Sequence, residues 1–320
     1  MQNNFVDNLT NEDIYTAEAS YQFRLGDFSG KVTGYYTRFN NGVEQTAFYN
    51  DQEERFTYLT MTNVNREHYG VEAALKYNLT SNFSVSLTGT YAEAQYLNNP
   101  LAQVAYEGMN ASTLKTLNTW KNPVTGQQMP LCVVADGMRV NGTPLTAISL
   151  GLNYNVNGWF FEANLNYYDR VYISFAPYRR LTSTYQLAGK FYTPSVDASG
   201  KLSYGDETMQ QKYMKEGGIL FAQNGSIVDT QAAEQEKFKG GFMLDLSIGR
   251  YIRLAKGKSI SINLSVQNVT NNRNLRTGGY EQNRDDFYNT GVAKAYTFSK
   301  NSKYYYANAF NAFLNVGFKF

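Results

Sequence analysis

The feature that most constrains the fold is an alternation of apolar and polar side chains with a period of two residues. Phe83, Val85 and Leu87, for example, are separated by single serine residues. Successive side chains of a β-strand point to opposite faces, so this period predicts strands with one apolar and one polar face. Nine segments carry the pattern, and we predict strands over 13–25, 28–39, 56–78, 83–96, 145–155, 159–172, 241–253, 259–269 and 307–320.

The connections between these strands alternate in length. Short turns lie near 27, 80, 157 and 256, and the long connections are 40–55, 97–144, 173–240 and 270–306. Loops longer than roughly 12–15 residues are uncommon in compact domains. Barrels of outer membranes have short periplasmic turns and long outer loops. The alternation therefore favours an all-β, antiparallel transmembrane β-barrel over a soluble sandwich, in which the polar face would meet bulk water.

Composition supports this fold class. The chain has 27 Tyr and 20 Phe but only 2 Trp. A tyrosine ring has an apolar body and a polar tip, which suits the interface between lipid and water, and such barrels carry aromatic girdles at both interfaces. No apolar run is long enough for a membrane-spanning helix. The net charge of +2 gives no basic field for nucleic acid.

Residues that carry chemistry are scarce. Cys132 is the single cysteine and His68 the single histidine, whereas zinc sites need several such ligands. A Ser–His–Asp set could use only His68, which lies on a predicted strand. No paired carboxylates and no nucleophile motif stand out. We therefore predict no enzyme activity, no metal site and no cofactor.

The strand count suggests that part of a barrel is absent. With the short turns on the periplasmic side, the first strand starts outside and the ninth ends inside, although bacterial barrels of this kind have an even strand count. The segment after Met1 also lacks the basic start and apolar stretch of a secretory signal. We expect further strands upstream of this chain.

Several segments resemble parts of a known family. Asn63-Val64 and Gly70-Val71-Glu72 resemble a mid-barrel strand signature, and Asp245-Leu246-Ser247 and 265–271 (SVQNVTN) resemble the two strands before the last. Segment 277–284 (TGGYEQNR) resembles a loop in a branch that carries a small N-terminal regulatory-like domain. In this order, the segments make essentially the whole chain resemble the C-terminal half of TonB-dependent receptors.

This resemblance implies a barrel of about 22 strands, of which these are the last nine. It implies that residues 1–320 are a C-terminal barrel portion without the plug domain, in the outer membrane of a Gram-negative bacterium. Such receptors bind an extracellular nutrient and import it with energy passed on by TonB, which they contact through the plug region. The implied partners are thus outer-membrane lipid, TonB and a nutrient that could be a siderophore, corrinoid, glycan or peptide. Without the plug, the chain alone should not support energised transport.

Candidate ligand contacts lie in the long loops. Aromatic residues and arginine are favoured in recognition sites, and the loops hold Tyr106, Trp120, Tyr178, Arg179 and Arg180. The alternative is that these side chains pack loop against loop.

The chain ends on alternating residues with Phe318 and Phe320, which resembles the last strand that the barrel-assembly machinery recognises in many outer-membrane barrels. The alternative is an ordinary apolar strand.

Two other functions remain open at this point. A passive porin or adhesin barrel needs no plug, and its upstream sequence would contain only more strands. A soluble secreted β-protein that binds glycans with its loops would express well without detergent.

Overall fold

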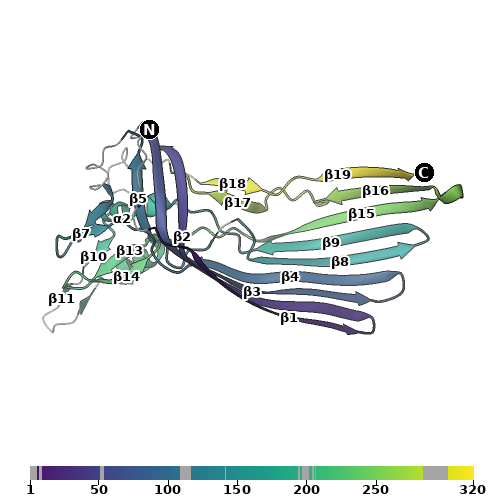
Figure 1. Cartoon of the computed structure of the whole chain (residues 1–320), viewed down its shortest axis with the longest axis horizontal. Coiled ribbons are helices and arrows are strands. Elements are labelled where there is room, and N and C mark those ends of the chain that lie inside the picture. The colour runs from purple at the N-terminus through teal and green to yellow at the C-terminus, as the bar shows by residue number, and fades with distance from the viewer. Residues whose placement is uncertain are drawn as a thin grey trace.

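The computed structural model describes residues 6, 9–50, 54–108, 117–140, 142–193, 195–196, 202–203, 205, 207–283 and 302–320. Its main feature is an antiparallel sheet in which nine strands follow one another in chain order (Figure 1). The strands are β1 (Asp13–Leu25), β2 (Phe28–Asn50), β3 (Arg55–Asn78), β4 (Phe83–Tyr96), β8 (Thr146–Val156), β9 (Trp159–Asp169), β15 (Gly241–Arg253), β16 (Ser259–Gln267) and β19 (Asn311–Lys319). The nine predicted strands are confirmed. The sheet is not closed, and β1 and β19 form its two edges.

The predicted long loop at 40–55 is wrong, because β2 and β3 continue as a paired hairpin to Asn50 and Arg55. The register shifts between Phe39 and Gly42 and again between Gly42 and Glu44, and Asn41 has a positive φ of 60°. Bulges of this kind interrupt the period of two. The alternation in the sequence therefore breaks at a point where the strand itself does not end.

The last predicted strand also starts later than expected, at Asn311 instead of 307. Just before it, the backbone N–H of Phe310 donates to Asn271 Oδ1 over 3.1 Å, and Asn268 Nδ2 donates to the carbonyl oxygen of Asn308 over 2.8 Å. These side-chain bonds replace sheet pairing at that point.

Cross-strand pairs confirm the two predicted faces, since directly paired residues share a face. Tyr21 pairs with Val32 and Val32 with Ala73, and Leu150 pairs with both Leu87 and Leu165. We call this side the apolar face; its members include Val71, Leu75, Val85, Ile148, Leu152, Leu246, Ile248, Ile262, Leu264, Leu314 and Val316. These side chains stay accessible, with Leu150, Leu152 and Ile248 each 39 % exposed.

The opposite side, which we call the polar face, carries mainly short polar side chains. Ser20 and Thr33 share a hydrogen bond of 2.9 Å, and Ser247 Oγ donates to Asn263 Oδ1 over 2.9 Å. Lys31, Glu72, Thr88, Ser149 and Asn166 line a hollow of about 410 Å³ on this face. Side chains that form hydrogen bonds among themselves and with water suit a wet interior of a wide barrel.

The two ends of the sheet differ, as Figure 1 shows. All short turns and the C-terminus lie at one end, and the turn after β15 contains η2 (Ala255–Gly257). The long connections, which contain further strands and helices, extend towards the other end. The predicted alternation of short and long connections is thus confirmed, apart from 40–55.

The long connections fold into small elements, and we call those between β4 and β8 and between β9 and β15 the cap. The first holds β5 (Leu101–Tyr106), which pairs with β3, and the hairpin of β6 (Thr119–Lys121) and β7 (Gln128–Pro130). The second holds η1 (Pro177–Arg180), α2 (Thr182–Leu187), β10 (Phe191–Tyr192), β11 (Ser195–Val196), β12 (Leu202–Ser203), α3 (Glu207–Glu216), β13 (Gly218–Phe221) and β14 (Ile227–Gln231). The last connection holds the hairpin of β17 (Arg276–Tyr280) and β18 (Lys303–Tyr306).

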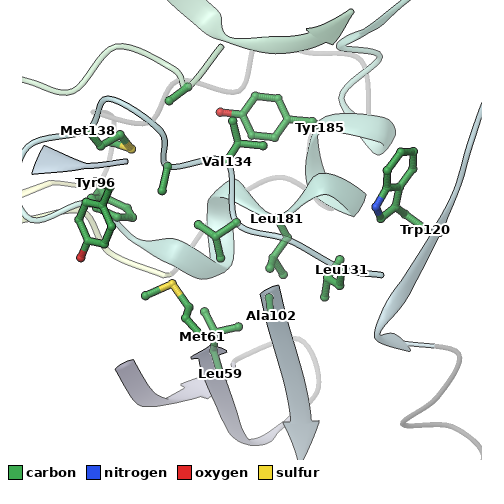
Figure 2. Close-up of a cluster of buried hydrophobic side chains, with 14 of the residues drawn as sticks. Leu59, Met61, Tyr96, Ala102, Trp120, Leu131, Val134, Met138, Leu181 and Tyr185 are labelled. Carbon is green, nitrogen blue, oxygen red and sulfur yellow. The ribbon is translucent and has the colours of Figure 1, made fainter. Parts of the chain in front are cut away.

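The hydrophobic core lies in the cap and not in the wall of the sheet. Leu59 and Met61 of the extended hairpin meet buried cap residues such as Leu131, Val134 and Leu181 (Figure 2). A sheet one layer thick has nothing to pack on either face, whereas the cap lies against the extension of β3. Burial of a single leucine stabilises a fold by about 1.5–3 kcal/mol, so this cluster fixes the cap on the sheet.

Two segments that carried the family resemblance meet in the structure. Asn268, which is fully buried, donates its backbone N–H to Asp245 Oδ1 over 2.8 Å, and its side chain bonds to the Asn272 carbonyl oxygen over 3.0 Å. Asn268 has a positive φ of 50°, a conformation that asparagine tolerates better than most residues. The residue therefore joins the end of β16 to β15.

Within the described ranges, each helix falls short of the length and apolarity that a bilayer-spanning helix requires.

Candidate functional site

The structure brings together two of the predicted ligand contacts, Tyr106 and Tyr178. Their hydroxyl oxygens lie 3.1 Å apart, although the residues belong to different long connections. Asn50 Nδ2 donates to Tyr178 Oη over 3.4 Å, and the Tyr178 ring meets Phe48 edge to face with centroids 5.0 Å apart. The pair therefore joins β5 and η1 to the extended part of β2.

Trp120 lies in the core of the cap and is only 4 % exposed. Its Nε1 donates to the carbonyl oxygen of Pro130 over 2.8 Å, and its ring contacts Phe191 and Phe221 at centroid distances of 5.2 and 6.0 Å. This is the loop-against-loop packing that the alternative describes. A ligand-binding role of Trp120 stays a prediction.

Arg179 and Arg180 are also buried, and they fix η1 to the segment after β17. Arg180 Nη2 donates to Glu281 Oε1 over 2.8 Å, and Nη1 bonds to the other carboxylate oxygen. Glu281 Oε2 also accepts the Ala176 backbone N–H over 3.0 Å. Arg179 Nη1 donates to the carbonyl oxygen of Gln282 over 3.0 Å.

Glu281 is a residue that the sequence analysis missed as a partner. It lies 101 positions from Arg180, so no local pattern connects the two. The one feature of the sequence that singled out Glu281 was its place in segment 277–284, which carries part of the family resemblance. Arg284, the last residue of that segment, lies outside the described residues.

A cavity of about 210 Å³ opens between the extended hairpin and the segment before η1. Glu44 is the acidic residue of its lining. Its Oε1 lies 2.9 Å from Arg66 Nη1, and its Oε2 accepts a hydrogen bond of 2.9 Å from the Tyr96 hydroxyl. The residues that line it are Glu44, Gln45, Thr46, Leu59, Met61, Tyr96, Arg139, Ser174, Phe175 and Pro177. None of the predicted ligand contacts belongs to this lining, although Tyr178 follows directly after Pro177.

Register places the Glu44 wall of the cavity on the polar-face side of the sheet. Arg66 pairs directly with Tyr96, and the next pair on the same face is His68 with Ala94. Tyr69, one position after His68, lies on the apolar face, so Arg66 and Tyr96 lie on the polar-face side. Since Glu44 contacts both Arg66 and Tyr96, its carboxylate lies on that same side. The Glu44 wall of the cavity therefore lies on the polar-face side, whereas Arg139, which bridges Gln95 and contacts Glu93, lies on the opposite side of the sheet.

Burial shifts the pKa values of two ionisable groups in the cap. Burial raises the pKa of the Cys132 thiol to about 11, and Sγ donates to the carbonyl oxygen of Pro130 over 3.6 Å. Burial also lowers the pKa of Lys190, an effect that the hydrogen bond of 2.9 Å from Nζ to Glu216 Oε2 partly offsets. A protonated thiol is a poor nucleophile, so Cys132 is not poised for covalent chemistry at neutral pH.

The parts of the chain that the structure describes contain no group of three or more His, Cys, Asp or Glu residues that could hold a metal ion. The His68 ring packs edge to face on Phe39, with centroids 5.2 Å apart.

The C-terminal phenylalanines lie at the short-turn end of the sheet (Figure 1). Phe318 pairs with Ile260 on the apolar face, and its ring stacks on Phe320 with centroids 5.9 Å apart. Phe320 is 91 % exposed. Both rings are thus accessible from outside the sheet.

Comparison with known proteins gives one family match. The family described as "TonB dependent receptor-like, beta-barrel" matches residues 1–269. No curated protein matches the chain.

Among solved structures, the chain is similar to the outer membrane transporter YddB from Escherichia coli, with 11 % identity and a TM-score of 0.47 over 97 % of this chain and 33 % of that one. It is also similar to a chain of the FpvAI–pyocin S2 complex, with 10 % identity and a TM-score of 0.39 over 95 % of this chain and 27 % of that one. The chain spans a third or less of the length of these proteins.

Proposed function

Since the chain belongs to the TonB-dependent receptor-like β-barrel family, we propose that it forms the C-terminal part of an outer-membrane receptor that imports an extracellular nutrient with energy from TonB. The family consists of receptors and transporters and not of enzymes. The nutrient binds on the side of the cap, and TonB acts through a plug region outside residues 1–320.

The observation that carries this proposal is the layout of aromatic rings on the apolar face. Four strands have an aromatic residue at each end of their apolar stretch, eight positions apart: Phe28 and Tyr36, Tyr69 and Tyr77, Phe83 and Tyr91, Trp159 and Tyr167. Neighbouring rings are close, as with Tyr36 and Tyr69 at 6.4 Å and Phe83 and Tyr154 at 6.4 Å. Two aromatic rows thus border one apolar band.

The height of this band suits a bilayer. Eight residues of strand span about 26 Å, and a tilt of about 40° leaves a height of roughly 20 Å. The apolar band of outer-membrane barrels is about 25 Å tall. The apolar face therefore meets lipid, and the polar face lines the lumen.

The open edges support a larger barrel. In lipid, each unpaired backbone N–H or C=O group at an edge costs several kcal/mol. We therefore propose that β1 and β19 pair with further strands, in a barrel of about 22 strands.

Surface labelling tests the placement in the outer membrane. In a Cys132→Ser background, Val228→Cys puts a thiol on exposed β14 of the cap, and Lys258→Cys puts one beside the exposed turn after β15. A membrane-impermeant maleimide should label position 228 in intact cells and position 258 only after permeabilisation. Labelling of both positions, or the reverse order, would contradict the proposed topology.

Energised import is tested by growth on a panel of single nutrients. A strain without the receptor gene and a strain without TonB should lose growth on the same nutrient. A passive porin would instead leave growth unaffected by loss of TonB.

We also propose that Phe318 and Phe320 contact the barrel-assembly machinery. Phe320→Ser should lower the amount of protein in the outer membrane several-fold, with Lys319→Ser as the matched control. Equal yields of the two variants would remove support for this role.

A further inference from the structure

We propose that the apolar face of β1–β4 holds a membrane lipid whose headgroup carries a phosphate. One acyl chain lies in a hollow of that face, and the phosphate lies against Arg139 and Arg170 at the cap-side end of the hollow. The inference rests on the proposed function, because it requires the apolar face to meet a bilayer, and it goes beyond that function by naming a lipid site.

Glu93 has two arginine partners. Its Oε2 lies 2.8 Å from Arg139 Nε, and its Oε1 bonds to Arg170 Nη2. Two positive charges and one negative charge leave a net charge of +1 on the three side chains. Their exposed fractions are 18 % for Glu93, 26 % for Arg139 and 11 % for Arg170. Because partly buried charges are screened less than exposed ones, the excess positive charge acts strongly at this point.

Neighbouring carboxylates do not supply the missing negative charge. Asp169 Oδ1 lies 3.5 Å from Lys237 Nζ, and Glu67 lies directly opposite Arg38 across β2 and β3. Among the described residues, Arg170 Nη1 is also a buried donor without a hydrogen-bond acceptor. Guanidinium groups bind phosphate with two parallel hydrogen bonds, so the cluster favours a phosphate-bearing ligand.

The cluster lies on the apolar face, just on the cap side of an aromatic row. Glu93 pairs directly with Tyr69, and the Arg170 guanidinium carbon lies 4.5 Å from the centroid of the Tyr91 ring. Tyr69 and Tyr91 both belong to the aromatic row nearer to the cap. Such rows lie at the interfaces of the bilayer, so the two arginines lie at the height of lipid headgroups.

A hollow of about 630 Å³ extends from Glu93 along the apolar face. One directly paired row of its lining has small side chains, namely Ala19, Gly34 and Val71. A Cβ added to Gly34 would have no atom within 4 Å, so the space is open on this face. The rings of Tyr36, Tyr69 and Tyr91 also belong to the lining.

This arrangement matches the two parts of a lipid. The apolar hollow takes an acyl chain, and its volume lies in the range of about 300–1,000 Å³ that is usual for ligand sites. The arginine cluster takes the phosphate at the end of that chain. A free phosphate would leave the hollow unused, and an uncharged lipid would leave the excess positive charge unpaired.

Native mass spectrometry of the full chain, purified in detergent, tests the inference. The probes are dioleoyl phosphatidic acid, dioleoylglycerol, which lacks the phosphate, and glycerol 3-phosphate, which lacks the acyl chains. We expect phosphatidic acid to bind at least tenfold more tightly than either of the others. Equal binding of dioleoylglycerol would remove the role of the phosphate, and equal binding of glycerol 3-phosphate would remove the role of the hollow. Either result would overturn the inference.

Charge variants assign the phosphate to this cluster. Arg170→Met leaves Glu93 paired with Arg139 and removes the excess charge, and we expect about tenfold weaker binding of phosphatidic acid, which corresponds to about 1.4 kcal/mol. Glu93→Gln removes the shared carboxylate and should strengthen the binding. If both variants weakened it, the cluster would serve only to hold the structure together, and the inference would be wrong.

Arg250→Met is the matched control. Arg250 is an exposed arginine at the short-turn end of the sheet, and its guanidinium carbon lies 4.8 Å from the centroid of the Trp159 ring. We expect this variant to bind phosphatidic acid like the native chain. A loss as large as that of Arg170→Met would indicate general attraction of anionic lipid to arginine and overturn the site.

Gly34→Leu tests the hollow. The new side chain fills open space next to the backbone of β2, and we expect several-fold weaker binding of phosphatidic acid. Val32→Leu is the control, because Val32 lies on the same face of the same strand and outside the lining of the hollow. Equal affinity of the Gly34→Leu variant and the native chain would place the acyl chain elsewhere.

The outcomes separate this inference from the proposed function. A chain that fails the surface-labelling test contradicts the outer-membrane placement. A chain that passes that test and binds phosphatidic acid no better than dioleoylglycerol overturns only the lipid site.

Discussion

At the scale of residues, the side chains predicted as ligand contacts also make contacts within the cap and with the segments beside it. Arg180 is fully buried and donates two hydrogen bonds to Glu281. Its guanidinium carbon lies 5.4 Å from the centroid of the Phe175 ring. A sequence shows which residue types occur in a loop but not which of them face each other. Arginine and aromatic residues serve recognition and packing equally well, so composition alone could not separate the two roles.

Breaking the Arg180–Glu281 pair should loosen the cap. Arg180→Met leaves a buried carboxylate without its partner, a change that costs about 3–5 kcal/mol. The expected result is faster proteolysis of segment 173–240 with unchanged cleavage of the short turns.

The double variant Arg180→Met with Glu281→Leu removes both charges and should regain most of the protease resistance, because apolar replacements of a buried pair are often neutral. Faster proteolysis in the double variant than in Arg180→Met would contradict a structural role of the pair.

Cys132 should show the pH profile of a partly buried thiol. Because burial raises its pKa to about 11, the reactive thiolate is scarce at neutral pH and increases tenfold per pH unit until the pH approaches that value. The rate of alkylation by iodoacetamide should therefore still rise above pH 10. A plateau near pH 9, the value of an ordinary thiol, would show that the thiol is not buried.

At the scale of elements, the sequence predicted the sheet well and the cap poorly. Each of the nine strands follows from the local period of two, which any lipid-facing strand with a polar lumen side must have. The extension of β2 to Asn50 was missed because the bulges around Gly42 break that period. The small strands of the cap were missed because contacts such as that of β10 with β13 join distant segments.

The two faces of a strand should respond in opposite ways to a charge. Leu150 lies in the middle of the apolar face and Ser149, one residue earlier, lies on the polar face. Leu150→Arg should destabilise the protein by about 2–4 kcal/mol, because an arginine at the midplane of the membrane is costly on the lipid side. Ser149→Arg should cost much less.

Denaturant unfolding in lipid vesicles measures the free energies of unfolding of both variants. Equal losses would mean that the two faces of β8 meet the same surroundings.

At the scale of the whole molecule, the structure combines a wall one strand thick with a packed cap at one end (Figure 1). The wall has no core of its own, and its apolar face needs a partner along the full width of nine strands. In the proposed outer-membrane placement, lipid provides this partner without side-chain specificity, which is why a simple period of two was enough to predict the wall. The cap and the extension of β3 share a specific core, in which Leu59 of β3 and Trp120 of the cap are nearly inaccessible to solvent.

The most direct test of this account is a scan of spin labels along β8 in a lipid bilayer. Labels at 148, 150, 152 and 154 should be relaxed by oxygen, which dissolves in lipid. Labels at 149, 151 and 153 should be relaxed by a water-soluble nickel reagent. This alternation would show that the apolar face meets lipid, whereas high accessibility to the nickel reagent at all seven positions would contradict a transmembrane barrel.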